Sequence, residues 1–236
     1  MPVLYSIILP AFNEEAAIER AVRETAASFD ALGQPYEIIV VDDGSTDRTA
    51  ALVEAMRADI PALRILAHKT NRGKGAAVRT GALSAAGEVT LFFDCDLSTR
   101  PATFRAFIPL LASTDIVIGS RRVPGAVITR AQKRWRSSLG RIFNAFIRLY
   151  LRLPYRDTQC GFKAIKRTAL PILQTIESDG WAFDVELLAR ARAKGLKIAE
   201  CPVTWSNRRE SRVRLGSAWS IFNELRRIKR AVQTAR

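Results

Sequence analysis

Short apolar runs alternate with amphipathic stretches over the first half of the chain. The apolar runs predict buried strands, at residues 5–10, 37–41, 63–67, 89–94 and 115–119. Apolar positions at helical spacing between these runs predict helices, at about residues 14–32, 46–59, 76–86 and 103–111. This alternation predicts an α/β fold, with a mostly parallel central sheet and helices on both of its faces.

The second half of the chain follows a different pattern. Aromatic and aliphatic residues recur at helical spacing over residues 135–153, with arginines between them, and predict a basic amphipathic helix. We expect a helix at residues 182–193, a strand at 197–204 and a second basic amphipathic helix at 217–231.

Two of the predicted strands lead into pairs of carboxylates. Asp42 and Asp43 follow one strand, and Asp94 and Asp96 follow another. In an open α/β sheet, ligands bind outside the carboxyl ends of the strands. Mg²⁺ prefers one or two carboxylates together with phosphate oxygens, so these pairs indicate a nucleotide-linked substrate. The chain has neither of the common glycine-rich phosphate motifs, and phosphate binding is therefore expected to depend on a metal ion and side chains.

The net charge of +14 is concentrated in two stretches. Residues 116–156 contain ten Lys and Arg and no Asp or Glu, and residues 201–236 contain nine basic residues against Glu210 and Glu224. Such asymmetry indicates an anionic partner for one face, which is an acidic lipid, a polyphosphate or a nucleic acid.

Cysteine usage and hydropathy bear on the compartment. The three cysteines are far apart and form no C-x-x-C pair, which favours free thiols in a reducing cytosol. We find no signal peptide and no apolar run of transmembrane length, so a cytoplasmic protein with peripheral membrane contact is expected.

Several motifs together resemble glycosyltransferase family 2, the inverting nucleotide-sugar transferases of GT-A fold. They are PAFNEE at residues 10–15, VDDGSTD at 41–47, NRGKG at 71–75, DCDLS at 94–98 and GSR at 119–121. Two later motifs, DTQCGFK at 157–163 and WAFDVELL at 181–188, are similar to the dolichyl-phosphate glucosyltransferase branch, close to the polyprenyl-phosphate hexose synthases. The resemblance implies a GT-A domain at 1–216, with a nucleotide-binding half at about 1–122 and an acceptor half at about 123–216. The C-terminal basic amphipathic helix then occupies 217–236.

The resemblance also implies a reaction and its residues. A hexose would pass with inversion from a nucleotide sugar, with UDP-glucose favoured over GDP-mannose, to a polyprenyl or dolichyl phosphate. Asp94 and Asp96 would hold Mg²⁺ or Mn²⁺. The expected donor contacts are Pro10, Phe12, Glu14, Asp42, Asp43, Lys74, Asp94 and Asp96. The expected catalytic residues are Asp157, Asp96 and Arg121, and the expected acceptor-phosphate ligands are Arg121, Arg122, Arg208, Arg212 and Arg214.

The role of Asp157 depends on the acceptor. A saccharide or glycolipid hydroxyl would require Asp157 as a general base. A phosphate monoester, with a second pKa near 6, is already ionised, and Asp157 would then only orient it. A non-enzymatic alternative is a basic nucleic-acid-binding protein, but no recognised nucleic-acid-binding motif occurs and no nucleic-acid partner is expected.

The helix predicted at 135–153 is expected to bring the protein to its lipid substrate. Trp135, Phe143, Phe146 and Tyr150 offer an apolar face, and the neighbouring arginines offer charge for an anionic membrane surface at the inner face of the membrane. The alternative is that this helix packs in a core or a dimer interface. His68, the single histidine, is expected to be structural.

Overall fold

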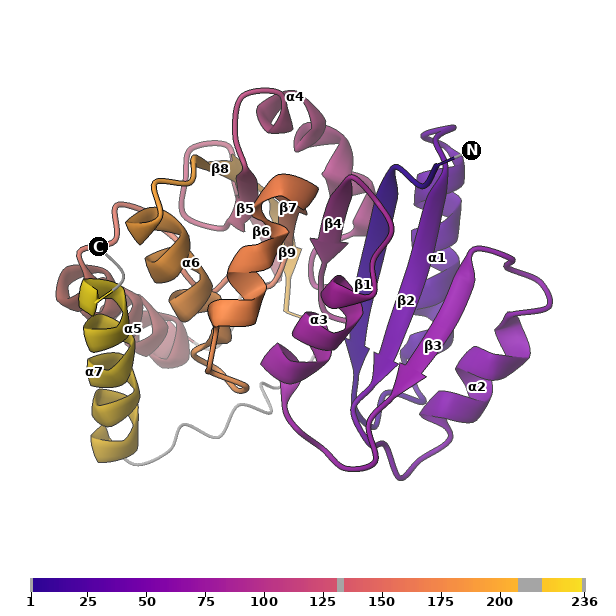
Figure 1. The fold of residues 1–236 in the computed structure, drawn as a ribbon, viewed down its shortest axis with the longest axis horizontal. Helices are drawn as coiled ribbons and strands as arrows, with labels where there is room; N and C mark the ends of the chain where they lie inside the picture. Colours follow the sequence, from indigo (N-terminus) through magenta and orange to yellow (C-terminus); the bar gives the residue numbers. More distant parts are fainter. Residues whose placement is uncertain (1, 131–133, 208–217, 235–236) are drawn as a thin grey trace.

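A computed structural model describes residues 2–130, 134–207 and 218–234, and its centre is a seven-stranded sheet (Figure 1). The strand order is β3-β2-β1-β4-β7-β5-β8. The bounds are β1 Tyr5–Ala11, β2 Tyr36–Asp42, β3 Leu63–Ala67, β4 Val89–Phe92, β5 Ile116–Ser120, β7 Lys163–Lys166 and β8 Ile198–Pro202. Strand β7 is antiparallel to β4 and β5, and every other neighbouring pair of this sheet is parallel. The predicted α/β fold with a mostly parallel sheet is confirmed.

Helices cover both faces of this sheet, as predicted (Figure 1). One face carries α1 (Ile18–Asp30), α2 (Thr49–Met56), the 3-10 helix η1 (Pro101–Ala106) and α4 (Ile108–Leu111). The other carries α3 (Lys74–Leu83), α5 (Arg134–Leu151), the 3-10 helix η2 (Arg167–Thr175), α6 (Phe183–Ala193) and α7 (Ala218–Thr234). Each face of the sheet has its own hydrophobic core. Because side chains alternate along a strand, β1 contributes Ile7 and Leu9 to the core on the α1 face and Ile8 to the core on the α3 face.

The loops after β1 and β2 are fastened to each other. The helix predicted to begin beside Glu14 begins at Ile18 instead. Asn13 has a positive φ of 52°, and its side-chain oxygen accepts a hydrogen bond from the backbone N–H of Thr46 at 2.9 Å. In return, the backbone N–H of Asn13 donates to Ser45 Oγ at 2.9 Å. Asn13 therefore ties two loops at one edge of the sheet rather than starting a helix.

Some elements differ from the prediction. The single helix expected at 103–111 is divided into η1 and α4, because Pro109 in the first turn of α4 has no N–H to continue the preceding turns. The strand expected at 197–204 ends at Pro202 and is followed by β9 (Thr204–Ser206), which pairs in parallel with β6 (Val127–Arg130) in a small second sheet. Strands β6 and β7 and helix η2 have no counterpart in the prediction.

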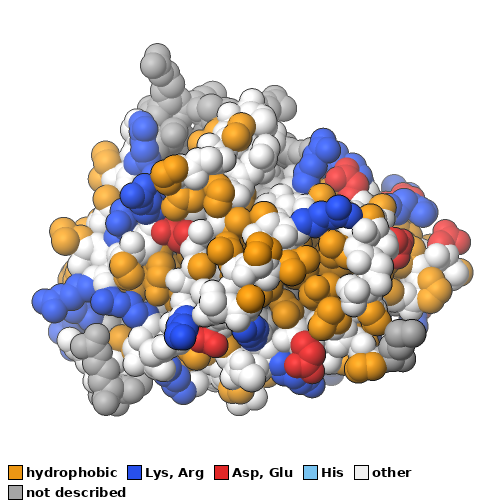
Figure 2. Space-filling model, turned by 90° about the horizontal axis from the view of Figure 1, so that it is seen from above, with side chains coloured by type: hydrophobic (Ala, Val, Ile, Leu, Met, Phe, Trp, Pro, Cys, Tyr) orange, Lys and Arg blue, Asp and Glu red, His pale blue; other side chains and the backbone are white. Residues whose placement is uncertain are grey.

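The C-terminal helix α7 belongs to the packed body of the protein. Leu225 and Ile228 are fully buried and join the core that α6 and η2 form on the same face of the sheet. Within the described ranges, each helix is too short or too polar to span a bilayer. Figure 2 views the molecule from the top of Figure 1, where Lys and Arg prevail on the left, towards α5 and α7, and acidic side chains mix with them on the right.

Candidate functional site

Parallel strands bring the predicted site residues to one edge of the sheet. Strands β1, β2, β4 and β5 all run in the same direction, since β7 is antiparallel to both β4 and β5. Asp42 ends β2 opposite Ala11, the last residue of β1. Asp94 and Asp96 follow β4, and Arg121 follows β5. The sheet therefore gathers carboxylates and an arginine where ligands of open α/β sheets bind.

Asp94 is paired with Lys74, the first residue of α3. The Lys74 Nζ lies 2.5 Å from Asp94 Oδ1, and both side chains are half-buried. Burial alone would raise the pKa of Asp94, but the nearby Lys74 ammonium holds it below its ordinary value. The pair places a cation beside the expected metal ligands, where the phosphates of a nucleotide sugar would lie.

Asp96 forms a tight turn with Ser98. Its two carboxylate oxygens accept hydrogen bonds from the backbone N–H and the hydroxyl of Ser98, each at 2.8 Å. Burial and the charge of Asp94 nevertheless raise the pKa of Asp96. A divalent cation at this position would remove that repulsion.

A pocket lies beside these carboxylates. Its lining includes Asp94, Asp96, Ser98, Gly161 and Trp205. The described residues contain no group of three His, Cys, Asp or Glu side chains placed to hold a metal ion. Two carboxylates suit Mg²⁺ or Mn²⁺ that takes its other ligands from phosphate and water, so the donor set fits the expected metal.

Gly161 lies against the Lys74–Asp94 pair. A Cβ added at Gly161 would lie 2.5 Å from Asp94 Oδ2 and 2.8 Å from Lys74 Nζ. The close approach explains a glycine at this position of the 157–163 motif, because any side chain would push the two charged groups apart.

We expect Gly161→Ala to weaken binding of UDP with Mn²⁺ by about tenfold, because the displaced pair loses its geometry at a cost of about 1.4 kcal/mol. Isothermal titration calorimetry measures this affinity. Gly180→Ala is the matched control, since a Cβ there meets nothing within 4 Å. Equal UDP affinity in both variants would mean that the Lys74–Asp94 pair does not contribute to the site.

Arg121 and Asp157 form a bidentate ion pair. Arg121 Nε donates to Asp157 Oδ2 at 2.7 Å, and Nη2 donates to Oδ1 at 2.9 Å. The backbone N–H groups of Arg121 and Gln159 donate to the same carboxylate. Asp157 is 1% exposed, and although burial would raise its pKa, Arg121 lowers it to about 2. At neutral pH this carboxylate is ionised and fully hydrogen-bonded, so it is a poor base.

Arg122 points to α5 rather than to Asp157. Its Nη2 donates to the Gly140 carbonyl at 3.4 Å, and its Nε is buried without an acceptor among the described residues. Burial lowers the pKa of Arg122, and the charges of Arg121, Arg141 and Arg148 lower it further against the opposing effect of Asp157. Several guanidinium groups therefore gather beside the Arg121–Asp157 pair, which favours an anionic ligand there.

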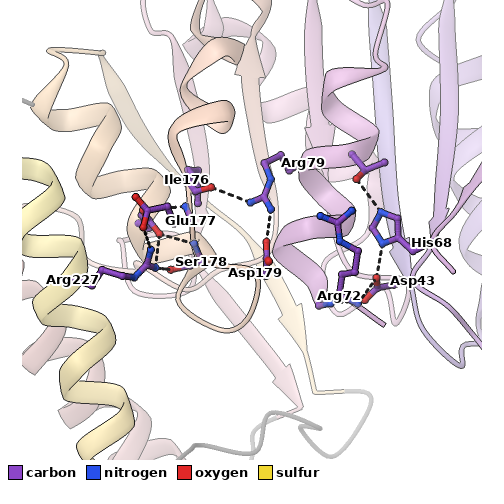
Figure 3. Close-up of polar contacts among 12 residues, drawn as sticks. Asp43, His68, Arg72, Arg79, Ile176, Glu177, Ser178, Asp179 and Arg227 are labelled. Carbon is purple, nitrogen blue, oxygen red and sulfur yellow. Dashed lines mark hydrogen bonds and ion pairs between the residues drawn. The ribbon is translucent and has the colours of Figure 1, made fainter. Parts of the chain in front are cut away.

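Asp43 is occupied by the chain itself. Its Oδ1 lies 2.7 Å from His68 Nδ1 and accepts the N–H of Arg72, and its Oδ2 accepts the N–H of Gly73 at 2.7 Å (Figure 3). Its carboxylate shapes the loop before α3, and the donor contact expected for Asp43 stays a prediction. His68, bonded to Asp43 and to Thr80 Oγ1, is structural as predicted.

Of the other predicted ligands, four lie within the described residues and three lie outside them. Pro10 is half-buried near the end of β1, Phe12 is 37% exposed in the loop after it, and Asp42 is buried at the end of β2. Glu14 lies in the same loop as Phe12, with its backbone N–H donating to Thr49 Oγ1 at 2.8 Å. Arg208, Arg212 and Arg214 lie outside the described residues.

The prediction missed a buried ion pair behind the site. Lys163 on β7 is fully buried, and its Nζ donates to Asp184 Oδ1 at 2.5 Å and to the Cys160 carbonyl. This pair fixes the backbone just before Gly161. The signal is that apolar residues flank both acids on successive faces of α6, at Phe183, Val185, Leu187 and Leu188, so the acids must be buried and partnered.

Comparison with known proteins agrees with this geometry. Residues 6–172 match the family model described as Glycosyl transferase family 2. The chain is 34% identical over 215 residues to "Glycosyltransferase AglD" of Haloferax volcanii, covering 89% of this chain and 34% of that protein. It is 34% identical to the dolichyl-phosphate beta-glucosyltransferase of Saccharomyces cerevisiae, covering 86% of this chain and 67% of that enzyme. It is 37% identical to the enzyme of that name in Drosophila melanogaster, with 85% and 66% covered.

The chain therefore spans about a third of the Haloferax protein and about two thirds of the yeast and fly enzymes.

A solved structure has the same fold. It is glucosyl-3-phosphoglycerate synthase from Mycobacterium tuberculosis in complex with Mn²⁺, UDP-glucose and phosphoglyceric acid. The two folds superpose with a TM-score of 0.65 at 22% sequence identity, over 99% of this chain and 79% of that one. The predicted GT-A fold is confirmed.

Proposed function

The chain belongs to glycosyl transferase family 2, and from that premise we propose that it transfers glucose from UDP-glucose to a polyprenyl or dolichyl phosphate, with inversion. The observation that carries this proposal is the bidentate Arg121–Asp157 pair, whose guanidinium lies 5.5 Å from the ring centroid of Trp205, a residue that lines the pocket with Asp94 and Asp96. One edge of the sheet therefore combines an arginine that can bind an anion with two carboxylates that can bind a metal ion.

The donor side is the edge formed by β1, β2 and β4. Asp94 and Asp96 would hold Mg²⁺ or Mn²⁺, which neutralises charge on the departing diphosphate when bound. Lys74, fixed by Asp94 at 2.5 Å, provides a positive charge for the diphosphate oxygens. The base and ribose would contact Pro10, Phe12, Glu14, Asp42 and Asp43. The Mn²⁺ and UDP-glucose in the mycobacterial enzyme's complex support this arrangement through the shared fold alone.

The acceptor side is the edge beyond β5, where Arg121 and Arg122 lie. A phosphate monoester oxygen attacks the anomeric carbon, the bond from that carbon to the UDP oxygen breaks, and the UDP oxygen keeps the electron pair. No proton moves, because the phosphate is mostly ionised above pH 6. This requirement agrees with Asp157, whose pKa of about 2 makes it an orienting group for Arg121 and a poor general base. A hydroxyl acceptor would need a stronger base than the Asp157 carboxylate to remove its proton.

The relatives' names support the same acceptor. The yeast and fly proteins are dolichyl-phosphate beta-glucosyltransferases. The gathered charges of Arg121, Arg122, Arg141 and Arg148 also suit a lipid phosphate.

The experiment that tests this function is a donor panel. The protein is incubated with a divalent cation, a short polyprenyl phosphate in detergent, and labelled UDP-glucose or GDP-mannose. We expect organic-extractable label from UDP-glucose. Label from GDP-mannose alone would reassign the sugar and the base, and no extractable label from either donor would reject lipid glycosylation.

A lipid acceptor requires the protein to reach a membrane surface, and α5 carries a suitable face. Leu139, Ile142, Phe146 and Leu149 are 51%, 67%, 43% and 82% exposed, and they recur at helical spacing. Exposed Arg141 and Arg152 lie on the same helix or just after it. We propose that this face docks on an anionic leaflet at the inner face of the membrane as a peripheral contact.

The docking face differs in part from the one that the sequence predicts. Phe143 is half-buried against Trp181, with ring centroids 5.5 Å apart, and Tyr150 is half-buried between Phe146 and Phe222. The side chain of Trp135 lies outside the described residues. The pattern of a single helix cannot tell which of its aromatic residues face a neighbouring helix.

Replacing Ile142 and Leu149 together by Ser should reduce binding to anionic vesicles by about tenfold or more, because two large side chains lose apolar contact worth roughly 1.5–3 kcal/mol each when fully buried. Vesicle co-sedimentation measures the loss, and UDP affinity should be unchanged. Leu83→Ser is the control, since Leu83 is 51% exposed on α3. Unchanged vesicle binding in the double variant would exclude α5 as the docking face.

A further inference from the structure

A buried carboxylate on α6 organises the loop before that helix. Glu186 is fully buried and accepts hydrogen bonds from the backbone N–H of Ser178 at 2.8 Å and from Arg190 Nε at 2.6 Å. The N–H of Glu177 donates to the same carboxylate at 3.3 Å. Burial would raise the pKa of Glu186, but these hydrogen bonds lower it. The loop at residues 176–179 is therefore held to an ionised, buried group.

Helix α7 contributes one more arginine to this loop. Arg227 Nη2 donates to Ser178 Oγ at 2.7 Å and to Glu186 Oε2 at 3.2 Å, and Nη1 pairs with Glu177 (Figure 3). The fully buried Leu225 and Ile228, two residues before and one after Arg227, fix the helix in place. A single side chain of the C-terminal helix thus contacts Glu177 and Ser178 in the loop and Glu186, the carboxylate that holds the loop.

The same loop caps α3, the helix that begins with Lys74. Within the described part of the chain no side chain caps the start of α3, and the N–H of Gly75 donates instead to the Asp179 carbonyl at 2.7 Å. A Cβ at Gly73 would lie 2.5 Å from that carbonyl oxygen, and a Cβ at Gly75 would lie 2.7 Å from the Ser178 carbonyl oxygen. Loop 176–179 therefore touches the chain on both sides of Lys74.

Arg79, within α3, also bonds to loop 176–179. Its Nη1 donates to the Ile176 carbonyl at 3.1 Å, and its Nη2 pairs with Asp179 (Figure 3). On the other side of the Lys74 loop, Asp43 holds the N–H groups of Arg72 and Gly73. Lys74 is thus placed between an anchor at Asp43 and the loop that Arg227 holds.

We propose that Arg227 is a positioning residue for the donor site, acting through loop 176–179 on Lys74 and its partner Asp94. This inference rests on the proposed function, in which Lys74 faces the donor diphosphate. Without Arg227, Glu177 and Ser178 each lose one hydrogen bond, Glu186 loses another, and the cap of α3 loosens. Donor binding is then weakened, whereas the acceptor side at Arg121 and Asp157 is unaffected because it lies on other elements.

The test compares Arg227→Gln with Arg226→Gln in the full chain. Arg226 is the exposed neighbour on the same helix, so its replacement removes the same charge without touching the loop. In Arg227→Gln we expect the amides of residues 72–78 to exchange about tenfold faster, and the KM for UDP-glucose to rise about tenfold, for a loss of about 1.4 kcal/mol. The acceptor KM should be unchanged. Arg227→Lys, which keeps the charge but not the fork, should be intermediate.

A second variant keeps the test decisive if Arg227→Gln folds poorly. Arg79→Gln breaks the other end of the same link and should also raise the donor KM, and the two changes together should cost less than the sum of each. The proposal would be overturned if Arg227→Gln kept the wild-type rates of amide exchange and the wild-type KM for UDP-glucose. It would also be overturned if the KM for UDP-glucose and the KM for the acceptor rose equally. A wild-type protein without UDP-glucose turnover would contradict the proposed function, and the exchange measurement would still decide whether Arg227 holds the loop.

Discussion

Asp96→Asn is expected to lower the rate of sugar transfer by about 1,000-fold, equivalent to about 4 kcal/mol, while the protein stays folded. A carboxamide is a poor ligand for Mg²⁺ where a charged oxygen is needed. The raised pKa of Asp96, caused by burial and by Asp94, indicates a site that a cation would stabilise. Among the residues that the structure describes, its hydrogen bonds come only from Ser98 two residues away, so little tertiary structure depends on the charge.

Two controls separate loss of metal binding from loss of fold. Asp59→Asn alters an exposed aspartate on another part of the surface and should keep wild-type activity. Wild-type activity should vanish in a chelator and return with Mg²⁺ or Mn²⁺. Full activity in the chelator would remove the metal ion from the proposed chemistry, and wild-type rates in Asp96→Asn would remove this residue from the metal site.

Asp157→Asn should lower the transfer rate by about 100-fold, because Arg121 loses a bidentate partner and with it a fixed position beside the acceptor. The variant should also be less stable by roughly 3 kcal/mol, since it leaves a largely buried guanidinium without its counter-charge. Thermal unfolding and initial rates measure the two effects separately.

The pH dependence distinguishes an orienting aspartate from a base. The pKa of Asp157 is lowered to about 2, so its contribution to stability is present above about pH 4 and is lost as the pH falls towards 2. Between pH 5 and 9 its protonation state does not change. A fall in rate near pH 6 would then report the acceptor phosphate and should persist in Asp157→Asn. A rate that follows an essential base well above pH 6, and loses that dependence in the variant, would support a hydroxyl acceptor.

The position of the site could be predicted from local patterns. Apolar runs that lead into Asp42 and Asp94 are read directly from the sequence, and the carboxyl ends of parallel strands meet at one edge whatever the details of packing. Such patterns and motifs predict Asp94, Asp96, Arg121 and Asp157. In the structure Asp94 and Asp96 follow β4, and Arg121 follows β5 and pairs with Asp157.

Strand β7 could not be predicted in the same way. Its four residues, KAIK, begin and end with lysine, so they look like exposed chain. Lys163 is nevertheless fully buried, because Asp184 and the Cys160 carbonyl compensate its charge from elsewhere in the fold. A pairing between residues 21 positions apart has no local signature.

Asp43 shows another limit of prediction from the sequence. A carboxylate at a strand end suits a ligand, and the motif alone does not separate a ligand contact from a loop anchor. The N–H groups of Arg72 and Gly73 that bond to Asp43 come from about 30 residues further along the chain, so this anchoring role has no local signature.

The central claim is that a lipid phosphate oxygen accepts the sugar, and one comparison tests it most directly. The wild-type protein is given labelled UDP-glucose and Mg²⁺ with either a polyprenyl phosphate or the polyprenol of the same length. We predict label in the organic phase with the phosphate and none with the alcohol, in a product that mild acid cleaves as a sugar phosphodiester. Labelled product from the alcohol, or none from the phosphate, would contradict this account.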